Sequence, residues 1–222
     1  MIKNCIFDID GTLLDSNEYH AQAWLEAFAA YGKRIPLKKL RRCMGEGADQ
    51  LLPEFLDKKE IKKNGKELGK LAGEIFKRKY LAKVRPFPKV RQLFKTIRRR
   101  GVRIALASSG DASEVKKYGK IARVHDLVEH STSADDADKS KPSPDIFHAA
   151  LKLLGHPKHE LVLVIGDSPF DAIAARKAKL TAIGVRCGGF SRKILKAHGC
   201  RDVYKDPADI LRNIDAILLS AR

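Results

Sequence analysis

The sequence lacks any continuous run of about 18 apolar residues, the length that a membrane-spanning helix requires. The N-terminal segment "MIKNCIFDID" has no long apolar stretch ahead of its acidic residues, so we expect no signal peptide. These two absences predict a cytoplasmic protein without a membrane partner.

Cysteines are few, and their spacing matches no metal site. The chain has four, Cys5, Cys43, Cys187 and Cys200, and no two of them lie close together in the sequence. Scattered cysteines of this kind are typical of free thiols in a reducing compartment. The sequence therefore predicts neither a disulfide framework nor a cysteine zinc site.

Acidic residues are also scarce beside basic ones, with 27 Asp and Glu against 44 Lys and Arg and a formal charge of +17. Such an excess can indicate binding of nucleic acid or another polyanion. However, the clusters "KKLRR" (38–42), "KRK" (77–79) and "RRR" (98–100) follow helical patterns without interleaved aromatic residues. We interpret them as solvated helix faces that attract small anions, and keep a polyanion- or nucleic-acid-binding protein as one alternative.

From Pro86 onward, short apolar runs alternate with helical patterns. Further strands are predicted at 102–108, 125–132, 161–168, 180–187 and 202–205, with a last helix at about 208–220. Together with the apolar run that precedes Asp8, this alternation predicts an α/β fold with a doubly wound, Rossmann-like parallel sheet.

Residues 16–84 have a different pattern, in which helical spacing recurs and no convincing strand occurs. "EYHAQAWLEAFAAYG" predicts a helix that ends at Gly32, and the two prolines of "VRPFP" (84–88) mark a return to the sheet. We therefore expect a core domain of residues 1–15 and 85–222 and a helical domain of residues 16–84, in a monomer or homodimer.

Polar side chains stand where the predicted strands end, and ligands of such sheets bind at that edge, near the switch point in strand order. These residues are Asp8, Asp10, Ser108, Ser109 and Asp167, with Asp171 one helical turn later. The loop "KSKPSPD" adds Lys139 and Lys141, of which Lys141 is the candidate. Four carboxylates cannot share a small site unless a cation balances them. Ligands that offer only oxygen favour Mg²⁺, and histidine or cysteine, which would indicate zinc, is missing from the set.

The spacing of Asp8 and Asp10 suits phosphoryl transfer, because residues i and i+2 of a strand share one side. One carboxylate can attack phosphorus while the other protonates the leaving oxygen and then activates water. Gly11 allows a sharp turn, and the Thr12 hydroxyl and nearby backbone N–H groups can bind phosphate oxygens. Ser108 and Lys141 can neutralise the transferred group.

Four motifs in this order resemble the haloacid dehalogenase-like superfamily along essentially the whole chain. They read "DIDGTLLDS" (8–16), "ALASSG" (105–110), "KPSPDIF" (141–147) and "GDSPFDAIAA" (166–175). The resemblance implies that residues 16–84 form a helical cap of the C1 type. It also implies Asp8 as nucleophile, Asp10 as general acid and base, and Ser108 and Lys141 as phosphate ligands.

For the metal, the resemblance implies Mg²⁺ held by Asp8, the backbone carbonyl of Asp10, Asp167 and, directly or through water, Asp171. The second acid, Asp10, favours phosphoryl chemistry over dehalogenation, because dehalogenases of this superfamily lack it. Among phosphatases, the sequence is most similar to hydrolases of the phosphoglycolate phosphatase type.

A phosphomutase is the nearest alternative, because "EYHAQAW" (18–24) is similar to the first cap helix of the β-phosphoglucomutases. There the histidine, here His20, helps to set the acid/base group, although Trp24 and His20 can equally be packing residues. The mutases also carry a lysine and an arginine where this chain has Met44 and Ala48, which leaves only Lys38, Arg41 or Arg42 to replace them.

We therefore predict a Mg²⁺-dependent phosphatase that hydrolyses a small phosphorylated metabolite, such as phosphoglycolate or a sugar phosphate, through an aspartyl-phosphate. Substrate contacts are expected from His20 and from the cap loop at Gly45 and Glu46. In the core they are expected from Gly11, Thr12, Ser108, Ser109 and Lys141.

Overall fold

The computed structural model describes residues 1–220, and these contain one sheet of six parallel strands in the order β3-β2-β1-β4-β5-β6. This is the strand order of a doubly wound Rossmann-like sheet, so the predicted fold class is confirmed. The strands are β1 (Asn4–Phe7), β2 (Arg103–Ala107), β3 (His130–Thr132), β4 (Val162–Gly166), β5 (Thr181–Val185) and β6 (Cys200–Tyr204).

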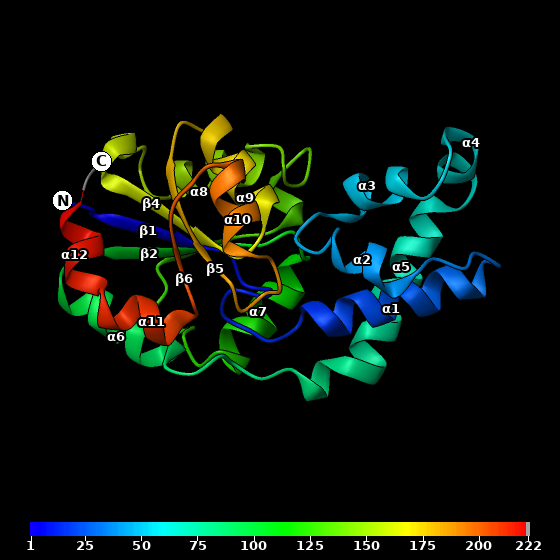
Figure 1. Ribbon diagram of the computed structural model, residues 1–222, viewed down its shortest axis with the longest axis horizontal. Helices are drawn as coiled ribbons and strands as arrows, with labels where there is room; N and C mark the ends of the chain where they lie inside the picture. Colours follow the sequence, from blue (N-terminus) through cyan, green and yellow to red (C-terminus); the bar gives the residue numbers. More distant parts are fainter. Residues whose placement is uncertain (221–222) are drawn as a thin grey trace.

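Helices cover both faces of the sheet (Figure 1). One face packs against α6 (Val90–Arg99), α7 (Ala112–Ile121), α11 (Pro207–Arg212) and α12 (Ile214–Leu219). The other side carries α8 (Asp145–Leu153), α9 (Pro169–Lys177) and α10 (Arg192–His198). Two short 3-10 helices, η5 (Ala134–Asp136) and η6 (His159–Leu161), lie in the connections.

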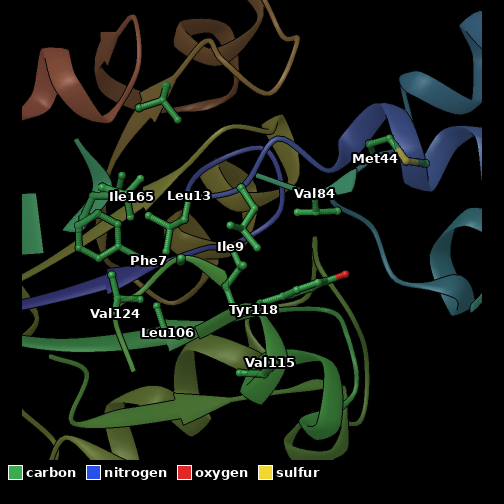
Figure 2. Close-up of a cluster of buried hydrophobic side chains, with 14 of the residues drawn as sticks. Phe7, Ile9, Leu13, Met44, Val84, Leu106, Val115, Tyr118, Val124 and Ile165 are labelled. Atoms are coloured by element: carbon green, nitrogen blue, oxygen red, sulfur yellow. The ribbon is translucent and has the colours of Figure 1, made fainter. Parts of the chain in front are cut away.

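Strand residues alternate between these two cores. Phe7 and Ile165 point into the first core, shown in Figure 2, whereas Ile6 and Val164 belong to the second. All four are at most 1% exposed. Because both faces are buried, the strands read as continuous apolar runs in the sequence rather than as alternating patterns.

Every element between β1 and α6 is a helix, and we call residues 16–84 the helical insert. Its longer helices are α1 (Asn17–Ala30) and α5 (Lys66–Ile75), which pack against each other. The shorter ones are α2 (Leu37–Arg41), α3 (Ala48–Leu51), η1 (Leu52–Glu54), α4 (Lys58–Glu60), η2 (Ile61–Gly65), η3 (Phe76–Tyr80) and η4 (Leu81–Lys83). In Figure 1 the insert lies beyond the end of β1 opposite the two chain termini.

The last predicted helix, 208–220, is two helices in the structure, because α11 ends at Arg212 and α12 begins at Ile214. Asn213 between them has φ −108° and ψ 9°, and its side-chain amide donates to the carbonyl of Asp209 at 2.9 Å. An asparagine side chain that binds a backbone carbonyl competes with continued helix formation. The predicted strand at 125–132 is likewise shorter and begins only at His130.

The four cysteines are free thiols, as predicted, with Cys5, Cys43 and Cys200 buried and Cys187 partly exposed. Among the helices of residues 1–220, none combines the length and the apolarity that crossing a membrane requires.

Candidate active site

The switch point of the sheet lies between β1 and β4, which are neighbours with Phe7 paired to Ile165. Asp8 follows β1 directly, and Asp167 follows the last residue of β4. The two carboxylates therefore emerge side by side at the edge where parallel sheets bind ligands.

Asp8, Asp167 and Asp171 form a buried carboxylate cluster, with one oxygen from each lying within 4.8 Å of the others. Lys141 reaches this cluster from the loop before α8. Its Nζ donates to Asp8 Oδ1 at 2.5 Å and to Asp171 Oδ1 at 2.8 Å, and its side chain is 1% exposed. One ammonium group thus faces three carboxylates, which leaves a net negative charge in a buried place.

The pKa values reflect this imbalance. Burial raises the pKa of Asp8, and Lys141 offsets only part of the effect, while burial and the charges of Asp8 and Asp171 hold the pKa of Asp167 well above its usual range. Burial alone would lower the pKa of Lys141, but Asp171 and Asp8 raise it overall, so the lysine stays charged. A buried, oxygen-only cluster with uncompensated negative charge fits a hard divalent cation such as Mg²⁺.

Two side chains orient the cluster. The Thr12 hydroxyl donates to Asp8 Oδ2 at 2.9 Å and lies 3.2 Å from Asp167 Oδ1. The Asn17 amide donates to Asp167 Oδ2 and to the carbonyl of Gly188, both at 2.9 Å. Thr12 therefore contacts carboxylates rather than the open site. Sequence reasoning missed Asn17, because nothing local indicates a partner 150 positions away.

Gly11 makes this close packing possible. Its φ is +74°, and a Cβ atom at this position would lie 2.2 Å from Asn17 Nδ2 and 2.4 Å from Asp167 Oδ2. Only glycine combines that backbone conformation with such an approach. Gly11, like Thr12, lies behind the carboxylates and does not line the cavity described below.

Asp10 is not part of the cluster and pairs with His20 of the helical insert. His20 Nε2 lies 3.1 Å from Asp10 Oδ1 and 3.1 Å from the Tyr118 hydroxyl, and Ser16 Oγ donates to Asp10 Oδ1 at 2.5 Å. The His20 ring stacks on Phe76 with a centroid distance of 3.8 Å. Figure 2 shows the Tyr118 hydroxyl directed out of the apolar core. Of the four predicted metal ligands, the Asp10 side chain is thus the one outside the cluster.

The Asp10–His20 contact shifts both pKa values. Burial would raise the pKa of Asp10, but the charge and hydrogen bond of His20 and the hydrogen bond of Ser16 hold it below its usual range. Burial would lower the pKa of His20, but Asp10 raises it overall. The pair therefore favours an ionised Asp10 beside a protonated His20.

A cavity of about 560 Å³ opens between the strand ends and the helical insert. On the core side its wall includes Asp8, Asp10, Ser109, Gly110 and Lys141. Ser108 lies just behind this wall, 1% exposed, with its Oγ accepting a hydrogen bond from the Gly110 N–H at 3.1 Å. The structure thus places Asp8, Asp10, Ser109 and Lys141 around one opening, whereas Gly11, Thr12 and Ser108 do not line it.

On the insert side the cavity is lined by Trp24, Met44, Gly45, Glu46 and Ala48, among others. His20 also contributes to the wall. None of Lys38, Arg41 and Arg42 lines it, and Arg41 instead binds Glu18.

The cations in the insert wall are Lys70 and Lys77, which sequence reasoning missed. Lys77 Nζ binds Asp111 at 3.0 Å and lies 3.6 Å from Glu114, both on the sheet side of the cavity. Asp111 precedes α7 and caps it. Because this local role is enough to explain an aspartate at this position, the sequence gives no indication of its contact with Lys77.

The family model described as "Haloacid dehalogenase-like hydrolase" matches residues 5–185 of the chain. The chain belongs to this family, and the predicted resemblance is confirmed. It is therefore a hydrolase.

Relatives agree with this assignment. The chain is 34% identical over 189 residues to YhcW, a candidate phosphatase of Bacillus subtilis, with 84% of this chain and 82% of that protein covered. It is 30% identical over 183 residues to a phosphoglycolate phosphatase of Nitrosospira multiformis, with 80% of each covered. The crystal structure of a hydrolase from Pseudomonas syringae superposes with a TM-score of 0.87 at 29% identity, covering 97% of this chain and 99% of that one.

Proposed function

We propose that the protein is a cytoplasmic Mg²⁺-dependent phosphatase that hydrolyses a small phosphomonoester through an aspartyl-phosphate on Asp8. The observation that carries the proposal is the contact between Asp8, Lys141 and the buried carboxylate cluster at the floor of the cavity. A phosphate placed there meets a nucleophilic carboxylate and a fixed cation together. The names of the relatives support the same reaction class.

In the first half of the proposed reaction, an oxygen of Asp8 forms a bond to phosphorus, and the ester P–O bond breaks. The protonated His20 passes its proton to Asp10, and Asp10 gives that proton to the leaving oxygen, while the hydrogen bond from Ser16 holds Asp10 in place. In the second half, Asp10 takes a proton from water as the water oxygen attacks phosphorus. Phosphate leaves, and the Asp8 carboxylate is restored.

Lys141 supplies the fixed positive charge for both halves of the reaction. Its hydrogen bonds to Asp8 and Asp171 already hold the ammonium group in place, so the side chain does not have to be ordered when phosphate binds. Asp8, Asp167, Asp171 and the backbone carbonyl of Asp10 are the proposed ligands of Mg²⁺. When bound, this ion would neutralise charge on the phosphoryl oxygens. Thr12 and Asn17 keep the acidic side chains oriented.

We also propose that the helical insert acts as a cap over the cavity. Support comes from its position beyond the end of β1 and from contacts that cross the cavity between the two parts. His20 meets Asp10, and Lys77 meets Asp111. These contacts would form when the cap closes over a substrate and exclude bulk water from the acyl phosphate.

A phosphomutase is the second candidate, favoured by the His20–Asp10 contact. Opposing it, Met44 and Ala48 line the cavity where a mutase would carry cations for a second phosphate. Product analysis after supplying β-glucose 1-phosphate with a bisphosphate primer separates the two. We expect free phosphate rather than glucose 6-phosphate.

The proposal is tested with p-nitrophenyl phosphate, whose hydrolysis should require Mg²⁺. Asp8→Asn should lower kcat by at least about 10³-fold, because the nucleophile is lost. Asp10→Asn should give a burst of p-nitrophenol and then stall, because this leaving group needs no acid whereas the second half needs a base.

Asp15→Asn is the matched control, since Asp15 is an exposed acid of the same segment and lies outside the cavity wall. Its activity should equal that of the wild type. Full activity of Asp8→Asn would disprove the nucleophile assignment, and unchanged turnover in Asp10→Asn would disprove the acid/base role.

A further inference from the structure

The carboxylate of Glu46 stands in the cavity wall without a partner. Among the described residues, its Oε2 has no hydrogen-bond partner although it is buried from solvent. Burial, with the charges of Glu54 on η1 and Asp49 on α3, raises the pKa of Glu46 to about 7. A buried acceptor without a donor is costly unless a ligand supplies one.

The rest of the cavity wall carries more acidic than basic residues. Beyond the reaction centre, the charged residues of the cavity wall are Glu46, Glu74, Asp111, Glu114, Lys70 and Lys77. Lys77 is already held by Asp111 and Glu114. Lys70 has its Nζ 4.0 Å from Glu74 and is 68% exposed, so solvent screens its charge. Glu74 is 59% exposed and is screened in the same way, and Asp111 and Glu114 share Lys77. Among these described wall residues, Glu46 is thus the carboxylate that no lysine balances.

We propose that Glu46 selects the leaving group, so that the enzyme prefers phosphomonoesters of uncharged, hydroxyl-bearing alcohols such as polyols and sugars. Esters that carry a carboxylate or a second phosphate beside the reacting group are poor substrates. A substrate hydroxyl donates to the carboxylate of Glu46, whereas a substrate carboxylate offers no proton and brings a like charge. This inference rests on the proposed phosphatase activity and decides between phosphoglycolate and a sugar phosphate, the two substrates that the sequence analysis predicted.

The experiment compares two substrates of equal length, 2-hydroxyethyl phosphate and 2-phosphoglycolate, which differ only in having a hydroxymethyl or a carboxylate group. The ratio of their kcat/KM values is measured, because a ratio does not depend on the fraction of correctly folded enzyme. Wild-type protein should favour the hydroxyl substrate by at least about tenfold. The pair glycerol 3-phosphate and 3-phosphoglycerate repeats the comparison with one more carbon.

Variants connect the preference to Glu46. Glu46→Gln keeps the shape but removes the charge, and should bring the ratio several-fold closer to one. Glu46→Lys should favour the carboxylate substrate. Glu67→Gln is the control, because Glu67 is an exposed acid of α5 outside the cavity wall, and its ratio should match the wild type.

A pH profile separates selection from a merely structural role. The wild-type ratio should increase as the pH rises through about 7, where Glu46 ionises, and the profile of Glu46→Gln should be flat. A wild-type preference for phosphoglycolate, or an unchanged ratio in Glu46→Gln, overturns the inference. The proposed function still stands in that case, provided that the protein hydrolyses p-nitrophenyl phosphate. No phosphate release from any ester, p-nitrophenyl phosphate included, overturns both.

Discussion

Gly11 shows how much of the site depends on one small residue. Gly11→Ala should abolish activity and greatly destabilise the fold, because its Cβ would overlap both Asn17 and Asp167 in a conformation with φ +74°. Gly32→Ala is the matched control, since Gly32 has φ +70° but no atom within 4 Å of the position that a Cβ would take. Gly32→Ala should lower the free energy of unfolding only by the cost of placing an alanine in the left-handed conformation, about 1 kcal/mol. Urea unfolding and phosphate release measure both effects, and equal losses would contradict the packing explanation.

For individual residues, the sequence predicted which charged side chains meet in the site, but not which neighbouring side chains keep them oriented. Asp8 and Asp167 could be predicted together because the carboxyl ends of the strands meet at one edge of a doubly wound sheet. Lys141 could be added because its loop lies between two of those strands in the sequence. Asn17 and Tyr118 differ, because their roles depend on side-chain contacts between segments that no local pattern connects. Thr12 was predicted to bind phosphate, and the structure places its hydroxyl on two carboxylates instead.

Among the elements, η3 and the start of α7 are joined across the cavity by Lys77 and Asp111. Lys77→Gln should raise KM and increase hydrogen exchange in α5 and η3, because the helical insert loses its contact with Asp111, which favours the proposed closed position. The loss in unfolding free energy should stay below about 1 kcal/mol, since the pair is part-exposed. Lys79→Gln is the control, because Lys79 binds Glu26 within the insert. If both variants shift KM equally, the contact does not govern closure.

Elements were predicted better than their ends. The apolar runs at 102–108 and 161–168 correspond to β2 and β4. They could be predicted because both faces of the sheet are buried, and a strand buried on both faces is apolar along its whole length. The break at Asn213 was not predicted, because an asparagine inside a helix can also direct its side chain to solvent. Only the hydrogen bond from Asn213 to the carbonyl of Asp209 shows that the helix is interrupted here.

For the whole molecule, the charge of +17 contrasts with an acidic reaction centre. Many cations of the basic clusters have acidic partners, as in Arg41 with Glu18 and Arg100 with Asp215. This pairing favours solvated helix faces over a continuous polyanion surface. The remaining excess still draws anionic substrates toward the protein from a distance.

The acidic centre also predicts how the whole molecule responds to magnesium. Mg²⁺ at one hundred times its dissociation constant should stabilise the fold by about 2.7 kcal/mol, which is a rise in Tm of several degrees for a chain of this size. Asp167→Asn should lose this rise. Without metal, Asp167→Asn should be at least as stable as the wild type, because it removes one of three crowded buried carboxylates while Asn17 can still donate to its side-chain oxygen. Asp15→Asn should keep the full shift, and a magnesium response that Asp167→Asn retains would place the ion elsewhere.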